Sequence, residues 1–149
     1  IVWMCSMTRL PRLMIAPNGA RRSKADHPAL PITDDELVET ALGCQQAGAD
    51  GVHLHIRDAQ GRHLLDATRY RALLDRMEDQ VPGMYLQVTS ESAGRYGADE
   101  QRAMMKALRP PHVSVALREM VRPTTGSKSN ISFIHRTKCA PLLTPATTD

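Results

Sequence analysis

Aromatic residues are scarce in this chain of 149 residues: they make up 3% of it, as one Trp, one Phe and three Tyr. The net charge is only +3, and basic residues are dispersed apart from the cluster Arg21-Arg22-Ser23-Lys24. Proteins that bind nucleic acids combine a concentrated basic surface with aromatic side chains on which bases stack. This sequence has little of either, so nucleic-acid binding is not predicted.

Paired cysteines and long apolar runs are also missing. Cys5, Cys44 and Cys139 are far apart and form no Cys-x-x-Cys pair, which argues against a disulfide framework and against a cysteine-based zinc site. Unpaired thiols are typical of a reducing compartment, so a cytoplasmic location is expected. No apolar run approaches the roughly 20 residues that a membrane span needs, so no membrane association is expected.

The first residues do not have the features of a targeting segment. Ile1 to Cys5 are too few for a signal peptide and lack its basic start. Met7 is a more natural initiator than Ile1. We therefore expect residues 1–9 to be a leader of doubtful nativeness.

Predicted strands and helices alternate between residues 13 and 119. Thr33 and Glu36 form a capping box that starts the first helix, and Gly48 ends it. The second helix begins after Asp66 and the third near Asp99, each with an apolar stripe at helical spacing. The strands are predicted at 13–16, 51–58, 84–90 and 112–119. This βαβαβαβ order predicts an α/β fold with a parallel sheet and right-handed crossovers.

Each predicted strand after the first carries small or polar residues on one face. An open, doubly wound sheet normally buries both faces in apolar contacts, whereas a polar inner face suits the lumen of a TIM barrel. Four βα units make half of an eight-stranded barrel, so we expect residues 10–122 to be the N-terminal half of a (β/α)8 barrel. Residues 123–149 are rich in Ser, Thr and Pro, and we expect them to form an irregular tail.

The segment Gly51-Val52-His53-Leu54-His55-Ile56-Arg57-Asp58 alternates apolar and polar residues. Its three apolar side chains fall on one face of a strand, and His53, His55 and Arg57 fall on the other. Two imidazoles on the same side can point at one centre and supply half of the tetrahedral shell of a divalent metal such as zinc. The structural alternative is two histidines satisfied by hydrogen bonds in a polar core.

The loop after the first predicted strand is basic, with Arg21, Arg22, Lys24 and His27. Basic residues in loops are usually solvated. Because these follow a strand end directly, binding of an anion is the functional alternative.

Several motifs appear together and in a characteristic order: 16-APNGARR-22, 27-HPALP-31, 47-AGA-49, 53-HLHIRD-58 and 117-LRE-119. With them, residues 10–122 resemble the β-keto acid cleavage enzymes, a family that includes 3-keto-5-aminohexanoate cleavage enzyme. The resemblance implies a zinc-dependent (β/α)8 barrel. It also implies a reaction that converts a β-keto acid and acetyl-CoA into acetoacetate and a new acyl-CoA.

The resemblance further implies roles for particular residues. His53 and His55 match the two metal-binding histidines. Thr89 or Ser90, and Ser114, correspond to polar catalytic contacts at strand ends, where hydroxyls can hydrogen-bond a carboxylate or a developing oxyanion. Asn18, Arg21 and Arg57 are the expected substrate contacts, although some members carry an acidic residue where this chain has Arg21. The family's third metal ligand, a glutamate, and its late Arg and Asp lie on strands that this sequence does not contain.

Two other interpretations stay open. Metal-dependent amidohydrolases also carry a His-x-His pair in a barrel, but on the first strand, whereas here a strand and a helix precede it. Alternatively, the chain is a truncated barrel fragment without catalysis of its own. A half-barrel leaves two strand edges open, so we also expect self-association or a homo-oligomer.

Overall fold

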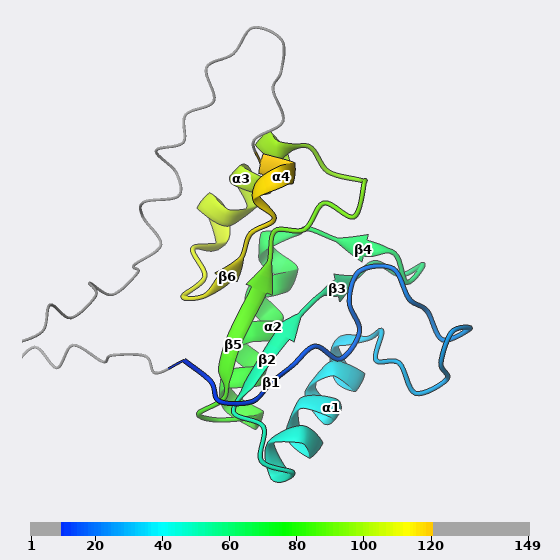
Figure 1. The fold of residues 1–149 in the computed structure, drawn as a ribbon, viewed down its shortest axis with the longest axis vertical. Coiled ribbons are helices and arrows are strands. Elements are labelled where there is room, and N and C mark those ends of the chain that lie inside the picture. Colours follow the sequence, from blue (N-terminus) through cyan, green and yellow to red (C-terminus); the bar gives the residue numbers. More distant parts are fainter. Residues whose placement is uncertain (1–9, 121–149) are drawn as a thin grey trace, which may run out of the picture.

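The computed structural model describes residues 10–120, in which a four-stranded parallel sheet is the central element (Figure 1). Its strands follow the order β1-β2-β5-β6. They span Met14–Ile15, Gly51–Leu54, Tyr85–Thr89 and Val113–Ser114. All three neighbouring pairs are parallel, as the alternating pattern predicts.

Three main helices connect these strands: α1 (Asp34–Gln46), α2 (Ala67–Gln80) and α3 (Ala98–Leu108). Helix α2 lies behind the sheet in Figure 1 and contacts both α1 and α3. The strands also follow one another across the sheet in chain order, without the reversal that defines a doubly wound fold. A single helical layer and this strand order are what one part of a βα barrel would have.

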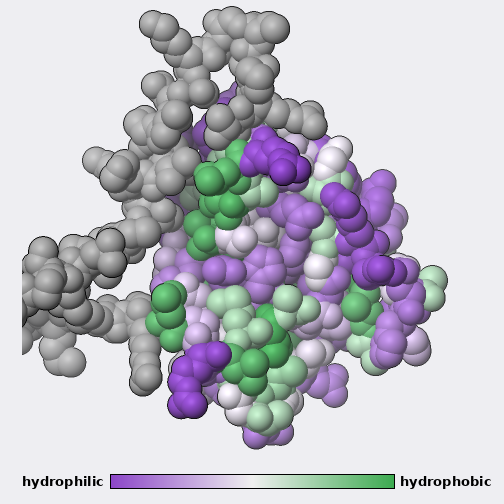
Figure 2. Space-filling view, viewed as in Figure 1, coloured by the Kyte–Doolittle hydropathy of each residue, from purple (hydrophilic) through white to green (hydrophobic). Residues whose placement is uncertain are grey.

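The two faces of the sheet differ in polarity. Val52, Leu54 and Val88 are fully buried against the helical layer, together with Leu37 of α1 and Tyr70 of α2. Figure 2 shows hydrophilic residues across the middle of the face that looks away from α2. The apolar core therefore lies between sheet and helices, and the functional candidates lie on the other side of the sheet.

Local sequence signals explain where the helices begin. Thr33 caps α1: its side chain accepts a hydrogen bond from the Glu36 backbone, and the Glu36 carboxylate accepts one from the Thr33 backbone. Asp66 caps α2 by accepting from the backbone of Arg69. None of the helices in residues 10–120 is long and apolar enough to cross a membrane.

The predicted strand over 51–58 is divided in two. Strand β2 ends at Leu54, and Ile56–Arg57 forms β3, which pairs antiparallel with β4 (His63–Leu64) in a separate two-stranded sheet. The turn between them is closed by Asp58, whose side chain accepts from the backbones of Gln60 and Arg62. This hairpin was not predicted, and it brings His63 back beside the end of β2.

The predicted strand over 112–119 is wrong beyond Ser114. Strand β6 has two residues, and Leu117–Met120 forms the short helix α4. In α3 the predicted core alanines, Ala103 and Ala107, are exposed, and Met105 is buried beside Met104 and Leu108. The predicted leader at 1–9 and the predicted tail at 123–149 lie outside the described residues.

Two glycines should respond in opposite ways to replacement by alanine. A Cβ on Gly51 would lie 2.7 Å from Cβ of Pro11, whereas a Cβ on Gly43, in α1, would have nothing within 4 Å. We expect Gly51→Ala to destabilise the fold by about 1–3 kcal/mol through overpacking. Gly43→Ala should stabilise it by about 0.5–1 kcal/mol because the unfolded chain loses freedom. Urea unfolding measures the stability of both variants. If Gly51→Ala and Gly43→Ala shift the unfolding midpoint equally, Pro11 does not pack closely on β2.

Candidate functional site

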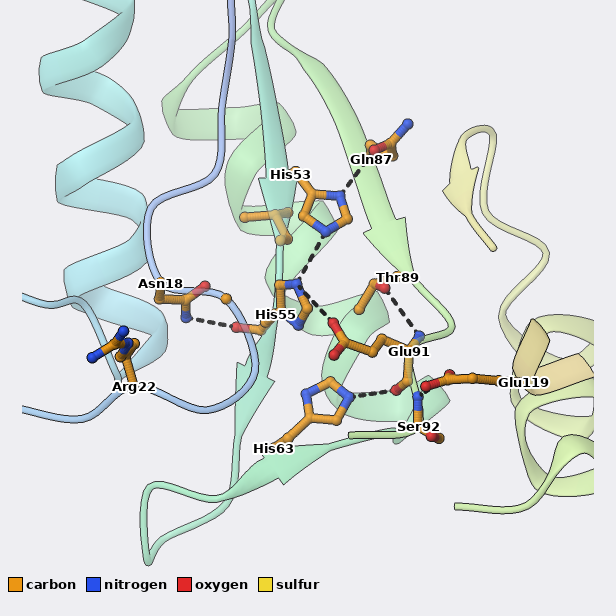
Figure 3. Close-up of polar contacts among 12 residues, drawn as sticks. Asn18, Arg22, His53, His55, His63, Gln87, Thr89, Glu91, Ser92 and Glu119 are labelled. Carbon is orange, nitrogen blue, oxygen red and sulfur yellow. Dashed lines mark hydrogen bonds and ion pairs between the residues drawn. The ribbon is translucent and has the colours of Figure 1, made fainter. Parts of the chain in front are cut away.

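The candidate site lies at the carboxyl ends of β2 and β5 (Figure 3). His53 belongs to β2, and His55 follows its last residue. Parallel pairing aligns His53 with Gln87 of β5. Because neighbouring parallel strands end at the same edge of a sheet, side chains far apart in sequence converge there.

The two histidines point at each other. Their Nε2 atoms are 3.0 Å apart, and the ring centroids are 4.8 Å apart at an interplanar angle of 74°. Zinc–nitrogen bonds of about 2.0–2.1 Å at tetrahedral angles separate two ligand nitrogens by about 3.3 Å. The predicted convergence of the rings is therefore confirmed, and the spacing is close to that of two ligands on one metal ion.

Gln87 fixes which nitrogen of His53 carries the proton. Its Oε1 accepts a hydrogen bond from Nδ1 of His53 over 2.9 Å. A neutral imidazole with its proton on Nδ1 has a free lone pair on Nε2, the atom that faces His55. Metal-binding histidines are usually held by such a partner on the other ring nitrogen.

His55 is buried, with only 3% of its surface exposed. Burial lowers its pKa from 6.5 to about 3, and the neighbouring His53, His63 and Arg57 add to this effect. The imidazole is consequently neutral near pH 7, which is the form that binds metals. Its Nδ1 has no hydrogen-bond partner among the described residues, and Asn18 donates to its backbone carbonyl over 2.9 Å.

The residues present fit half of a zinc site. Within residues 10–120, no three His, Cys, Asp or Glu side chains stand as a ready-made metal-binding group. Two imidazoles nevertheless converge through Nε2, and His53 is oriented by an outer partner. The arrangement can contribute two nitrogen ligands, and the metal role of His53 and His55 stays a prediction.

The three predicted catalytic hydroxyls lie near one another, in different surroundings. Thr89 is buried, and its Oγ1 accepts from the Glu91 backbone over 3.0 Å. Ser90 is fully buried, and its Oγ has no partner in the described part of the chain. Ser114 is half-buried and pairs with Thr89 across β5 and β6. Ser90 is thus the one of the three whose hydroxyl is buried without a partner in the described residues.

The three predicted substrate contacts lie apart. Asn18 is buried, and its Oδ1 has no partner among residues 10–120. Arg21 is exposed. The buried guanidinium of Arg57 donates to the backbone carbonyls of Asn18, Gly19, Arg22 and Gly61, so it holds the 18–22 loop against the β3–β4 hairpin. A substrate role for Arg57 is a weaker prediction after this result, since most of its donors are already used.

Two other basic residues of this loop are paired with acidic side chains. Arg22 forms an ion pair with Asp26 at 3.1 Å, and Lys24 forms one with Glu36 at 2.6 Å. The Lys24 ammonium, together with the backbone N–H groups of Thr33 and Ile32, lowers the pKa of Glu36 to about 2. These contacts favour the structural interpretation of the loop over binding of an anion.

The sequence did not point to two further residues beside the histidines. His63 is buried with its ring centroid 5.3 Å from that of His55, and its Nε2 donates to the backbone carbonyl of Glu91 over 2.7 Å. The Glu91 carboxylate lies 3.9 Å from Nε2 of His55. Both contacts depend on the unpredicted hairpin and on the path of the chain after β5, and neither has a motif of its own.

Burial of neutral histidines predicts a loss of stability in mild acid. In metal-free protein the pKa of His55 is lower in the folded than in the unfolded state, and that of His63 is lowered too. The contribution of these two histidines to the free energy of unfolding is therefore complete above pH 6.5. It is lost as the pH falls, because the histidines of the unfolded chain bind protons that those of the folded chain do not. With a chelator present, urea unfolding of the unchanged protein should give a free energy of unfolding that decreases from pH 7 to pH 5. For His55→Asn, this free energy should decrease less steeply over the same range.

A variant that is destabilised elsewhere separates this effect from a general loss of stability. Thr33→Ala removes the α1 cap and should cost about 1 kcal/mol at every pH in this range. The prediction would be wrong if His55→Asn kept the pH slope of the unchanged protein.

Comparison with known proteins connects this site to a family. The sequence pattern of the β-keto acid cleavage enzymes matches residues 12–146. The 3-oxoadipate:acetyl-CoA acetyltransferase of Cupriavidus necator is 35% identical over 118 residues, which is 79% of this chain and 41% of that protein. The 3-keto-5-aminohexanoate cleavage enzyme of Acetoanaerobium sticklandii is 30% identical over 98 residues, 65% of this chain and 35% of that enzyme.

A second 3-keto-5-aminohexanoate cleavage enzyme, from Fusobacterium nucleatum, is 31% identical over 75 residues, half of this chain and 28% of that enzyme. The chain thus spans less than half the length of each of these relatives. The family match nevertheless covers most of the chain, including the whole of the candidate site. The chain belongs to the β-keto acid cleavage enzyme family.

Proposed function

We propose that this chain carries the histidine half of a zinc-dependent β-keto acid cleavage site. The reaction would convert a β-keto acid and acetyl-CoA into acetoacetate and a new acyl-CoA. The observation that carries the proposal is the approach of the two Nε2 atoms, at 3.0 Å, in a chain of this family. The name of the Cupriavidus relative supports acetyl-CoA as the co-substrate.

His53 and His55 would hold the zinc ion, with Gln87 keeping the proton of His53 on Nδ1. A zinc ion bound there would act as a Lewis acid that stabilises negative charge on the reacting keto acid. Burial keeps His55 neutral and excludes water from one side of the pair. On metal binding, the proton that His55 Nε2 donates to His53 Nε2 would move to Nδ1 of His55, which has no partner among the described residues.

The unpartnered polar atoms beside the pair would bind the substrate. The Ser90 hydroxyl can donate to a carboxylate or an oxyanion, and Asn18 Oδ1 can accept from a hydroxyl or amide group. Thr89 would act mainly by shaping the turn that carries Glu91, because its hydroxyl is already engaged there. Ser114, at the end of β6, would be a further polar residue at the edge of the substrate site.

In this proposal, the chain supplies one part of the active site and other barrel strands supply the rest. The third family ligand and the late Arg and Asp would come from barrel strands that residues 10–120 do not contain. Strand order in the sheet supports a barrel, and β1 and β6 each have one unpaired edge within it. Self-association through these edges is part of the proposal, as is a cytoplasmic location. The amidohydrolase alternative is less well supported, because β1 and α1 precede the histidine strand.

Metal binding is the first expected result. The purified chain should bind one zinc ion weakly, and His53→Ala and His55→Ala should each remove that binding, since a single remaining imidazole is a poor site. His27→Ala is the matched control, because His27 is an exposed histidine in the basic loop. Calorimetric titration with zinc measures all four proteins. Equal binding by His53→Ala and the unchanged chain would contradict the metal role.

Substrate chemistry is the second expected result. The zinc-loaded chain should bind a β-keto acid such as 3-oxoadipate, and this binding should weaken in Ser90→Ala. It should produce at most a trace of acetoacetate from acetyl-CoA, because the groups proposed for the other strands are absent from the described part. Substrate titration and an acetoacetate assay check both points. Full turnover would refute the proposal that other barrel strands supply part of the active site. If the chain binds no β-keto acid, the proposed function is refuted.

A further inference from the structure

His55 lies where the pairing of β2 with β5 ends, so the sheet alone does not hold it. The last pair of that register is Leu54 with Val88, and the chain after His55 turns away into the β3–β4 hairpin. His53, by contrast, is paired within the sheet, and Gln87 holds its ring. The direction of the His55 imidazole therefore depends on contacts outside the strand pairing.

Side-chain donors hold the two peptide groups that flank His55. The hydroxyl of Tyr70, in α2, donates to the carbonyl of Leu54 over 3.1 Å. That carbonyl belongs to the same planar peptide as the backbone nitrogen of His55. On the other side of the residue, the Asn18 amide donates to the carbonyl of His55 over 2.9 Å. These two hydrogen bonds fix the direction in which the His55 side chain leaves the backbone.

The Tyr70 hydroxyl lies inside the core rather than at the surface. Tyr70 has no exposed surface, and burial raises the pKa of its hydroxyl, so the group keeps its proton and acts as a donor. The backbones of Ile56 and Thr89 oppose part of this rise in the pKa, so polar groups of both segments lie near the hydroxyl. The hydroxyl is therefore placed where β2 and β5 part from each other.

Packing of the core does not require a hydroxyl at this position. A phenylalanine would fill nearly the same space, and a buried polar group is costly unless it is hydrogen-bonded. We propose that Tyr70 is a positioning residue of the candidate site, whose hydroxyl holds the His55 imidazole in its direction toward His53. The inference rests on the proposed function for its effect on zinc binding, whereas the orientation of His55 can be measured without metal.

The first experiment measures the histidine rings of the full chain without metal. Nitrogen NMR distinguishes the two neutral tautomers of an imidazole, and His53→Ala and His55→Asn assign the signals. Because Gln87 places the proton of His53 on Nδ1, His55 donates from its Nε2 in the bond between the rings. In Tyr70→Phe, the His55 nitrogens should move toward the averaged shifts of mixed tautomers, while those of His53 should not.

Two variants control for the lost oxygen and for a general loss of stability. Tyr85→Phe removes a hydroxyl that has no hydrogen bond among the described residues, and it keeps the ring that stacks on His112. Thr33→Ala removes the α1 cap. Both should keep the His55 signals of the unchanged chain. If Tyr70→Phe also keeps them, or if all three variants lose them alike, the inference is overturned.

Hydroxyl exchange in the unchanged chain gives a result that does not need a folded variant. The hydroxyl proton of Tyr70 is buried and hydrogen-bonded, so it should exchange with water slowly enough to be observed by NMR. The hydroxyl proton of Tyr85, which is half-buried, is the internal reference. Equally fast exchange of the two protons would overturn the inference.

Zinc titration connects the inference to the proposed function. Tyr70→Phe should bind zinc about tenfold more weakly than the unchanged chain, since partners outside the ligand shell typically contribute at least that much. Tyr85→Phe should bind normally. Unchanged zinc affinity in Tyr70→Phe would overturn the inference and leave the histidine pair in place. If the unchanged chain binds no zinc while Tyr70→Phe still alters the His55 signals, the proposed metal site fails and the positioning role stands.

Discussion

The parallel pairing of β2 with β5 is the constraint on which the site depends. Its register places Gly51 beside Tyr85 and Leu54 beside Val88, so His53 necessarily lies beside Gln87. A shift by one residue would turn the imidazoles into the apolar layer and the apolar side chains out of it. The fully buried Val52, Leu54 and Val88 oppose such a shift. Core packing and the orientation of the candidate ligands are thus fixed by the same set of backbone hydrogen bonds.

Arg57 has a comparable role for the loops around the site. One guanidinium binds four backbone carbonyls from the 18–22 loop and the β3–β4 turn. A buried guanidinium is costly unless its donors are used, and here the carbonyls of an irregular loop use most of them. The loop in turn positions Asn18 against the His55 carbonyl. The polar residue that the alternating pattern placed next to the histidines therefore acts as a structural clamp.

Local patterns predicted the parts of this fold that depend on neighbours in sequence. Alternation of apolar and polar residues in β2 was sufficient to place His53 and His55 on one face, and Thr33 with Glu36 was sufficient to start α1. The same alternation failed at 112–119, because Val113, Val115 and Leu117 fit a short strand as well as a turn of helix. Strand β6 ends at Ser114, before the predicted end of the strand. The choice between strand and helix in this segment depends on packing against residues outside it.

The contacts that complete the site could not be predicted, because they join residues far apart in the chain. Glu91 meets His55 only because β5 ends beside β2, and His63 meets both only because the chain reverses after Arg57. Neither arrangement has a short motif. A glutamate in a polar loop is ordinarily solvated, so its sequence context gave no reason to single it out.

Buried polar atoms without partners gather at the same end of the sheet. In the described part of the chain, six buried side-chain atoms lack a hydrogen bond, and five of them belong to Asn18, His55, Arg57, His63 and Ser90. Each costs about 1–3 kcal/mol when left unpaired, and a fold under selection for stability alone would remove them or spread them. The sixth atom belongs to Gln101 in α3. The other five are therefore concentrated around the candidate site. In the proposed site an oxygen-rich substrate would supply partners to Asn18 Oδ1 and Ser90 Oγ, which accounts for part of this cost.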